Sequence, residues 1–158
     1  PWFNIYDNAL SDLGNVARNG TIALLYNFGL ILTGTFGTLF AIIVSVGHAS
    51  WKYRSWTISL VATGISLSLI GLFPEDAGRI HGLVSMLFFG LIATTMLIYS
   101  YSSWPLGSPR VGAIALTFGI ACPLVWILEW PWHGVAIQET LTSSMMTIWL
   151  IMVSLRNV

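Results

Sequence analysis

The acidic and imidazole side chains of this sequence are its main candidates for chemistry, because carboxylates and imidazoles bind divalent metals and transfer protons. Apart from His48, they fall into three groups that are far apart in the chain and stand near the ends of long apolar runs. If the fold gathers these groups at one place, they form a polar cluster that can hold a ligand. The candidate residues are Ser11, Asp12, Glu75, Asp76, Arg79, His81, His133 and Glu139.

The spacing of these residues does not match a known metal or nucleophile motif. His81 and His133 lack the HxxxH or HExxH spacing that places two ligands on one helical turn. Cys122, the one cysteine, has no second thiol with which to form a disulfide or a thiolate site. The sequence has no glycine-rich phosphate loop and no GxSxG motif. We therefore expect no cofactor, with a divalent metal at the polar cluster as the alternative, and assign no catalytic residue.

Helix starts offer a second explanation for the same carboxylates. Glu75 and Asp76 follow Pro74, and Glu139 stands early in an apolar run, so each lies where a helix is expected to begin. A carboxylate at that place complements the free N–H groups and the positive end of the helix dipole. Both explanations stay open at this stage.

Composition places the chain in a membrane. Hydrophobic residues make up 56% of the sequence and charged residues only 8%, whereas soluble domains carry about 25% charged residues. The mean hydropathy of +0.80 agrees with this class. Because the formal net charge is zero and no basic patch is present, we expect the lipid bilayer as a partner and no nucleic acid.

Five apolar runs are long enough to cross a bilayer, which takes about 20 residues in a helix. The connections between them are short and leave no room for a soluble domain. The predicted fold class is all-α, with a five-helix transmembrane domain over residues 21–158 and an interfacial segment over residues 1–20. The runs are Thr21–Gly47, Trp56–Phe73, Gly82–Tyr101, Val111–Leu128 and Val135–Leu155.

Basic residues predict the orientation, since Lys and Arg are enriched in cytoplasmic loops. Lys52, Arg54, Arg110 and Arg156 fall at alternate ends of the predicted spans. We therefore expect a multi-pass protein of the cell membrane, with a cytoplasmic C-terminus and with residues 1–20 extracytoplasmic. All six acidic residues then lie on the extracytoplasmic face.

The N-terminal segment is predicted to pack over that face. Apolar residues recur at helical spacing between Asn8 and Arg18, which predicts one short interfacial helix. One hypothesis is that this helix brings Asp12 into a polar cluster with residues of other segments. The alternative is that Asp12 only caps its own helix and faces water. The hypothetical cluster contains Asp12, Arg79, His81, His133 and Glu139.

Glu139 needs a partner more than the other acids do, because it stands inside an apolar run. A carboxylate within a span is costly unless it is paired, protonated or facing a wet cavity. An ion pair between Glu139 and Arg79 is the first expectation. A carboxylate that snorkels to the interface is the alternative.

Four motifs in order resemble one protein family. They are NALSDLG at 8–14, NFGLILTG at 27–34, GLFPED at 71–76 followed by His81, and GVAIQE at 134–139. Together they resemble the multi-pass membrane proteins of archaea and bacteria that are grouped as domain of unknown function 998 (DUF998). The resemblance implies a polytopic membrane protein and carries over no activity. It also implies one more hydrophobic helix, before the LSDLG motif, than this sequence beginning at Pro1 contains.

Two functions of different classes fit these residues. The first is an accessory or stabilising subunit of a membrane assembly, because small and aromatic residues on the spans offer surfaces to other subunits or to a second copy. The alternative is a membrane enzyme that acts on lipid headgroups at the extracytoplasmic face, with the polar cluster lining its site and a divalent metal as an optional part. A transporter fits less well, because the polar groups near mid-span are mostly Thr, Ser and Gly.

Overall fold

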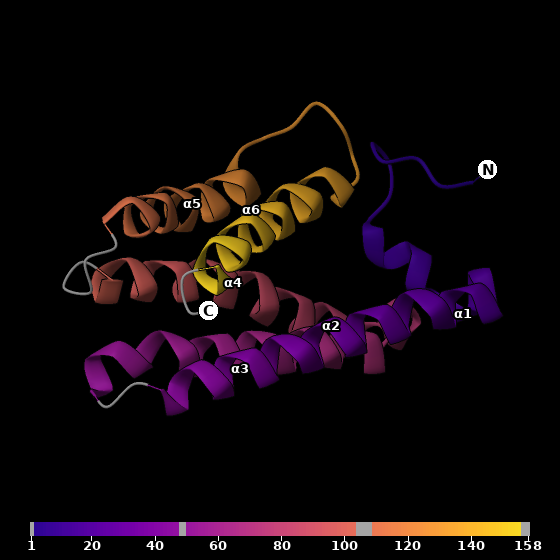
Figure 1. The fold of residues 1–158 in the computed structure, drawn as a ribbon. Coiled ribbons are helices and arrows are strands. Elements are labelled where there is room, and N and C mark those ends of the chain that lie inside the picture. Colours follow the sequence, from indigo (N-terminus) through magenta and orange to yellow (C-terminus); the bar gives the residue numbers. More distant parts are fainter. Residues whose placement is uncertain (1, 48–49, 104–108, 156–158) are drawn as a thin grey trace.

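The computed structural model describes residues 2–47, 50–103 and 109–155, and every regular element in these ranges is a helix (Figure 1). Two short elements come first and five long helices follow, with one further short turn between the second and third long helices. This confirms the predicted all-α helical bundle. The elements are η1 (Leu10–Gly14), α1 (Val16–Asn19), α2 (Thr21–Val46), α3 (Trp51–Leu72), η2 (Glu75–Ala77), α4 (Arg79–Ser103), α5 (Pro109–Ile127) and α6 (Ala136–Ser154).

Four of the long helices are long and apolar enough to cross a membrane. They are α2, α3 from Arg54, α4 and α5, with mean hydropathies between 1.6 and 2.0. The fifth predicted span is present as α6, but its first turns carry Gln138, Glu139 and Thr140 and reduce its apolar character. The chain is thus built as a multi-pass membrane protein.

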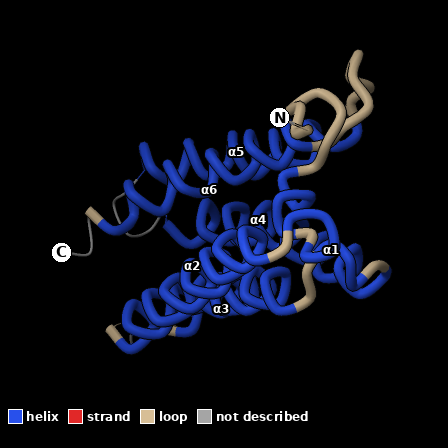
Figure 2. Tube along the Cα trace, turned by 90° about the vertical axis from the view of Figure 1, so that its right-hand side faces the viewer, coloured by secondary structure: helices blue, strands red, loops and turns tan. Residues whose placement is uncertain are grey.

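The long helices pack mainly against their neighbours in the sequence. Helix α2 packs on α3, α3 on α4, α4 on α5 and α5 on α6, and Figure 2 shows the N-terminal segment at the same end of the bundle as the loop before α6. Small residues allow the closest of these contacts, as expected for helices in lipid. At the α2–α3 contact, a Cβ atom on Gly34 would overlap the carbonyl oxygen of Gly64 and the backbone of Ser68.

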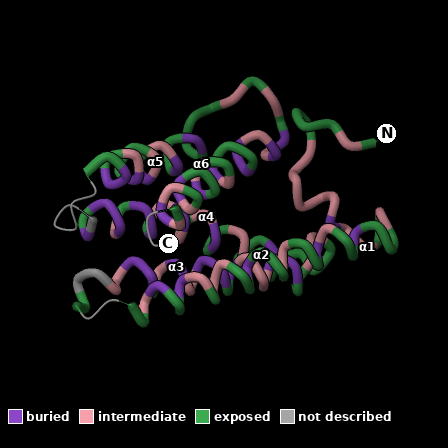
Figure 3. The backbone as a smooth tube through the Cα atoms, in the orientation of Figure 1, coloured by how far each residue is buried: buried purple, intermediate pink, exposed green. Residues whose placement is uncertain are grey.

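Three aromatic side chains of the core contact one another near the C-terminal ends of α4 and α6. Trp56, Tyr99 and Trp149 contact one another edge to face, with ring centroids 5.1–5.9 Å apart. Both tryptophans are almost fully buried, and their indole N–H groups have no hydrogen-bond partner within the described part of the chain. Figure 3 shows buried positions along the long helices between exposed ones, which suits helices whose outer faces meet lipid.

The N-terminal segment differs from the single interfacial helix that the sequence predicts. It forms the 3-10 turn η1 and the single-turn helix α1, with Asn15 in an extended conformation between them. The break has a local cause, because the Asn15 side chain accepts a hydrogen bond of 2.9 Å from the backbone N–H of Arg18 and so caps α1. Arg156 and the side chain of Lys52, which entered the orientation argument, lie outside the described structure.

Candidate functional site

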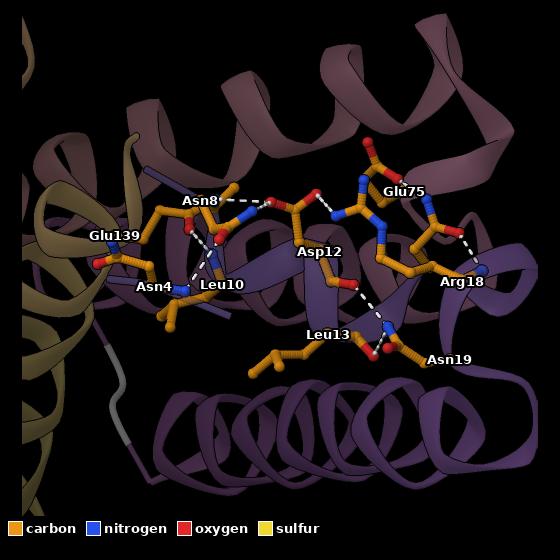
Figure 4. A network of polar contacts seen from close by, with 11 residues as sticks. Asn4, Asn8, Leu10, Asp12, Leu13, Arg18, Asn19, Glu75 and Glu139 are labelled. Atoms are coloured by element: carbon orange, nitrogen blue, oxygen red, sulfur yellow. Dashed lines mark hydrogen bonds and ion pairs between the residues drawn. The ribbon is translucent and has the colours of Figure 1, made fainter. Parts of the chain in front are cut away.

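The N-terminal segment is tied to the last helix through Leu10 (Figure 4). The backbone N–H of Leu10 donates a hydrogen bond of 2.5 Å to Glu139 Oε2 in the first turn of α6. The Glu139 side chain is therefore buried with a donor from another segment, and this donor is not Arg79. The expected ion pair between Glu139 and Arg79 is wrong, because the 3-10 turn η1 brings a free N–H to the carboxylate while Arg79 is exposed at the start of α4.

Asp12 organises the segment itself. Its Oδ2 accepts hydrogen bonds from the side-chain amide of Asn8 at 2.9 Å and from the backbone N–H of Ala9 at 3.0 Å. Its Oδ1 lies 3.6 Å from the guanidinium of Arg18, and only 16% of the Asp12 side chain is exposed. The hydrogen bond from Ala9 is the local cap that one alternative predicted for Asp12. That alternative also predicted that Asp12 faces water, whereas its side chain is mostly buried and lies beside Arg18.

The hypothetical five-residue cluster around Asp12 does not form by direct contact. Within the described residues, Asp12 makes no hydrogen bond or ion pair with Arg79, His81 or His133. Its link to Glu139 runs through the η1 backbone, since Ala9 and Leu10 donate to the two carboxylates in turn. Asp12 and Glu139 are therefore connected through backbone N–H groups of Ala9 and Leu10, and not through direct side-chain pairs.

Two acidic side chains in the turn between α3 and α4 accept hydrogen bonds from the N-terminal segment. The side-chain amide of Asn15 donates to Glu75 Oε2, and the backbone N–H of Val16 donates to Asp76 Oδ1 at 3.4 Å. Glu75 and Asp76 belong to η2, which precedes α4. They lie in the 3-10 turn η2, whereas α4 begins at Arg79 with no acidic residue in its first turn, and their carboxylates accept hydrogen bonds from Asn15 and Val16.

Asn27 connects the N-terminal segment to helix α2. Its side-chain amide lies in α2, is buried, and donates a hydrogen bond of 2.9 Å to the carbonyl oxygen of Gly14. A Cβ atom on Gly14 would overlap Asn27 Oδ1, so the close approach of η1 to α2 requires glycine at this position.

The loop before α6 pairs with the start of the chain through its backbone. The N–H groups of Val135 and Ala136 donate to the carbonyl oxygen of Asn8 at 3.1 and 2.9 Å. His133 is exposed in this loop, and its ring lies 3.9 Å from the Asp7 carboxylate. Because both groups are largely in water, this contact adds little.

A pocket of about 540 Å³ opens beneath η1, between α4, α5 and the start of α6. One part of its lining is polar and is formed by Ser11, His81, Ser85 and Glu139. The rest is apolar and comes mainly from α4 and α5, including Met86, Phe89, Ala93, Trp126 and Ile127. The pocket is thus amphipathic, with hydrogen-bonding groups beside a larger hydrocarbon wall.

His81 is buried at the polar part of this pocket with both ring nitrogens engaged. Its Nδ1 lies 2.9 Å from the carbonyl oxygen of Phe73, and its Nε2 lies 3.3 Å from Ser85 Oγ. A carbonyl oxygen only accepts, so Nδ1 carries the proton and donates it to Phe73. In the neutral imidazole, Nε2 is then free to accept from the Ser85 hydroxyl.

The structure distributes the sequence candidates over two places. Ser11, His81 and Glu139 line the pocket, whereas Asp12, Glu75 and Asp76 hold the N-terminal segment. Arg79 and His133 are exposed and line no described pocket. Across the described ranges, no three His, Cys, Asp or Glu side chains come together as a metal-binding group.

Sequence reasoning missed Ser85. The signal was present, because Ser85 follows His81 by four residues and positions i and i+4 share one face of a helix. A serine in an apolar helix is common as a packing residue, so the spacing alone did not single it out.

One protein-family model matches almost the whole chain. The family model described as "Protein of unknown function (DUF998)" matches residues 1–156. No curated protein and no solved structure matches the chain. The match covers all of the described helices and the motifs of the N-terminal segment, so the chain is a member of the DUF998 family.

Proposed function

We propose that this protein binds a membrane lipid in the pocket beneath η1, with the headgroup against the polar lining and an acyl chain against the apolar lining. The observation that carries the proposal is the composition of the pocket, which joins four hydrogen-bonding side chains to a longer wall of apolar ones. Ligand pockets of this size generally combine an apolar lining with a few well-placed polar groups. A lipid is the ligand class that such helices meet at high concentration.

The rim of the pocket supports entry from the bilayer. Met86 on α4 and Ile127 on α5 line the pocket, and they are 74% and 73% exposed. Exposed apolar side chains on helices of this kind are expected to face lipid. A lipid can therefore reach the pocket sideways, between α4 and α5, without crossing water.

The polar lining favours a headgroup that donates hydrogen bonds. Glu139 Oε2 is occupied by Leu10, while Oε1 accepts no hydrogen bond within the described chain. An oxygen of Glu139 in this place can accept a hydrogen bond from a headgroup hydroxyl or amine. We place this site on the extracytoplasmic face, on the strength of the basic-residue pattern of the loops.

The exposed outer faces of the helices are also compatible with an accessory subunit. Only 17% of the apolar window of α2 is buried within the chain. Lipid tails cover such a face as well as a partner helix does, so this feature does not favour the subunit over the lipid-binding protein.

Two glycine variants test lipid binding. Gly90 lines the pocket, and a Cβ there meets no atom within 4 Å, so Gly90→Leu is chosen to add a side chain at the pocket from an unobstructed Cβ position. Gly29→Leu on α2 is the matched control, because Gly29 is equally open and lies away from the pocket. Each protein is placed in nanodiscs with diacylglycerol, phosphatidylethanolamine and phosphatidylglycerol, and bound lipid is counted by native mass spectrometry.

Wild type and Gly29→Leu should each retain one lipid with a hydroxyl or amine headgroup. Gly90→Leu should lose it. Equal lipid retention by all three proteins, or no retained lipid in the wild type, contradicts the proposal.

A further inference from the structure

The hydroxyl of Ser85 makes a different hydrogen bond from most other hydroxyls in the long helices. Ser and Thr side chains in apolar helices commonly bond the carbonyl oxygen four residues earlier. Thr33, Thr94 and Thr117 do so here, with Oγ1 to oxygen distances of 2.8–3.0 Å. For Ser85 the residue four earlier is His81, and the hydroxyl lies instead at 3.3 Å from the Nε2 atom of its ring.

The end of α3 fixes His81 in the tautomer that this contact needs. Pro74 cannot continue the helix, and Phe73 at the C-cap has φ −114° and ψ 80°. The carbonyl oxygen of Phe73 accepts the Nδ1 proton at 2.9 Å. Since His81 is buried, this bond holds the ring in place and leaves the Nε2 lone pair directed at Ser85.

Both residues line the pocket that we assign to a lipid. A hydroxyl, a neutral imidazole that accepts its proton, and a third group that orients the imidazole are the parts of an activated serine nucleophile. A hydrogen bond somewhat longer than the usual O–H···N distance is normal for such a pair without substrate.

We infer that Ser85 and His81 form a nucleophile–base pair that cleaves an acyl ester of the lipid bound in this pocket. The inference rests on the proposed lipid site and adds a covalent reaction to it. Ser85 is the nucleophile, His81 is the general base, and Phe73 is a positioning residue that acts through its backbone carbonyl.

The reaction balances with water as the only co-reactant. Ser85 Oγ attacks the ester carbonyl carbon while its proton moves to His81 Nε2. The ester C–O bond breaks, and the leaving alcohol takes that proton, which leaves an acyl group on Ser85. Water then gives a proton to Nε2 and attacks the acyl carbon, and the Ser85 oxygen leaves with the proton and releases a fatty acid.

A fluorophosphonate probe tests the nucleophile directly, because it modifies activated serines and does not require the native substrate to be known. Wild-type protein in nanodiscs is treated with the probe, and the modified peptide is identified by mass spectrometry. We expect one label per chain, on Ser85. Ser11 in the same pocket and Ser143 on α6 serve as internal comparisons, so this result does not depend on any variant folding.

Three variants assign the roles. Ser85→Ala should abolish labelling, and His81→Gln should slow it by about 10²-fold or more, as for loss of a general base. Ser143→Ala, a change of the same size away from the pair, should label at the wild-type rate. Thermal melting in the same nanodiscs reports whether each variant is folded.

The lipid count separates failure of the reaction from failure of the site. A wild-type protein that retains lipid but is not labelled on Ser85, or is labelled equally on Ser11, overturns the nucleophile–base pair and leaves lipid binding standing. A wild-type protein that neither retains lipid nor is labelled overturns both. Labelling of folded His81→Gln at the wild-type rate overturns the role of His81.

Discussion

The backbone N–H of Leu10 and the carboxylate of Glu139 are joined by a hydrogen bond of 2.5 Å, although 129 positions separate them in the sequence. This contact closes the pocket at its polar part, since both Ser11, which follows Leu10, and Glu139 belong to the lining. It makes the N-terminal segment a wall of the site as well as a cover for the helix ends.

Loss of the Glu139 carboxylate should release the N-terminal segment. Glu139→Ala leaves the Leu10 N–H without its acceptor, at a cost of about 1–3 kcal/mol. We expect faster hydrogen–deuterium exchange over residues 9–14, measured by mass spectrometry. Glu129→Ala is the control, because Glu129 is an exposed acid in the loop before α6 and should leave this exchange unchanged. Equal exchange in both variants would show that the segment is held without Glu139.

Gly14→Ala should destabilise the protein. The added methyl group would overlap the Asn27 side chain, which must then move and give up its buried hydrogen bond to the Gly14 carbonyl. We expect a loss of about 1–3 kcal/mol, seen as a lower melting temperature in detergent. Gly29→Ala, where the methyl group meets open space, should melt at or above the wild-type temperature. Similar melting of the two variants would contradict the close approach of η1 to α2.

The α2–α3 contact makes a similar prediction at mid-span. Gly34→Ala should push α2 away from Gly64 and Ser68, whereas Gly37→Ala on the same helix adds its methyl group in open space. We expect Gly34→Ala to lower the free energy of unfolding by about 1–3 kcal/mol. The variant should then unfold at a lower denaturant concentration than wild type. A Gly34→Ala variant as stable as Gly37→Ala would mean that the helices are not in backbone contact there.

The orientation of the chain is a separate prediction. In a Cys122→Ala background, Glu129→Cys should react in intact cells with a thiol reagent that cannot cross the membrane, and Arg110→Cys should not. The reason is that the basic loops favour the cytoplasm. Both positions are exposed in the structure, so side-chain access does not distinguish them. The reverse pattern of labelling would invert the topology and move the pocket to the cytoplasmic face.

The helices were predictable from the sequence because each is a long apolar run with charged or glycine-rich ends. The α2 helix, for example, ends one residue before the predicted boundary at Gly47. The shape of the N-terminal segment was not, since apolar spacing could not reveal that Asn15 would cap α1 and break the helix at that point. The partner of Glu139 was missed for another reason. The partner is the backbone N–H of Leu10, and nearly every residue has such a group, so residue types alone cannot identify it.

The contacts of the N-terminal segment also constrain the order in which the protein can assemble. Residues 8–16 bond to Asn27 in α2, to Glu75 and Asp76 before α4, and to Glu139 in α6. Because a chain is synthesised from its N-terminus, this segment is made before any of those helices. The segment therefore lacks its full set of hydrogen-bond partners until α6 has been made, so its contact with Glu139 can form only after the other described helices have been synthesised.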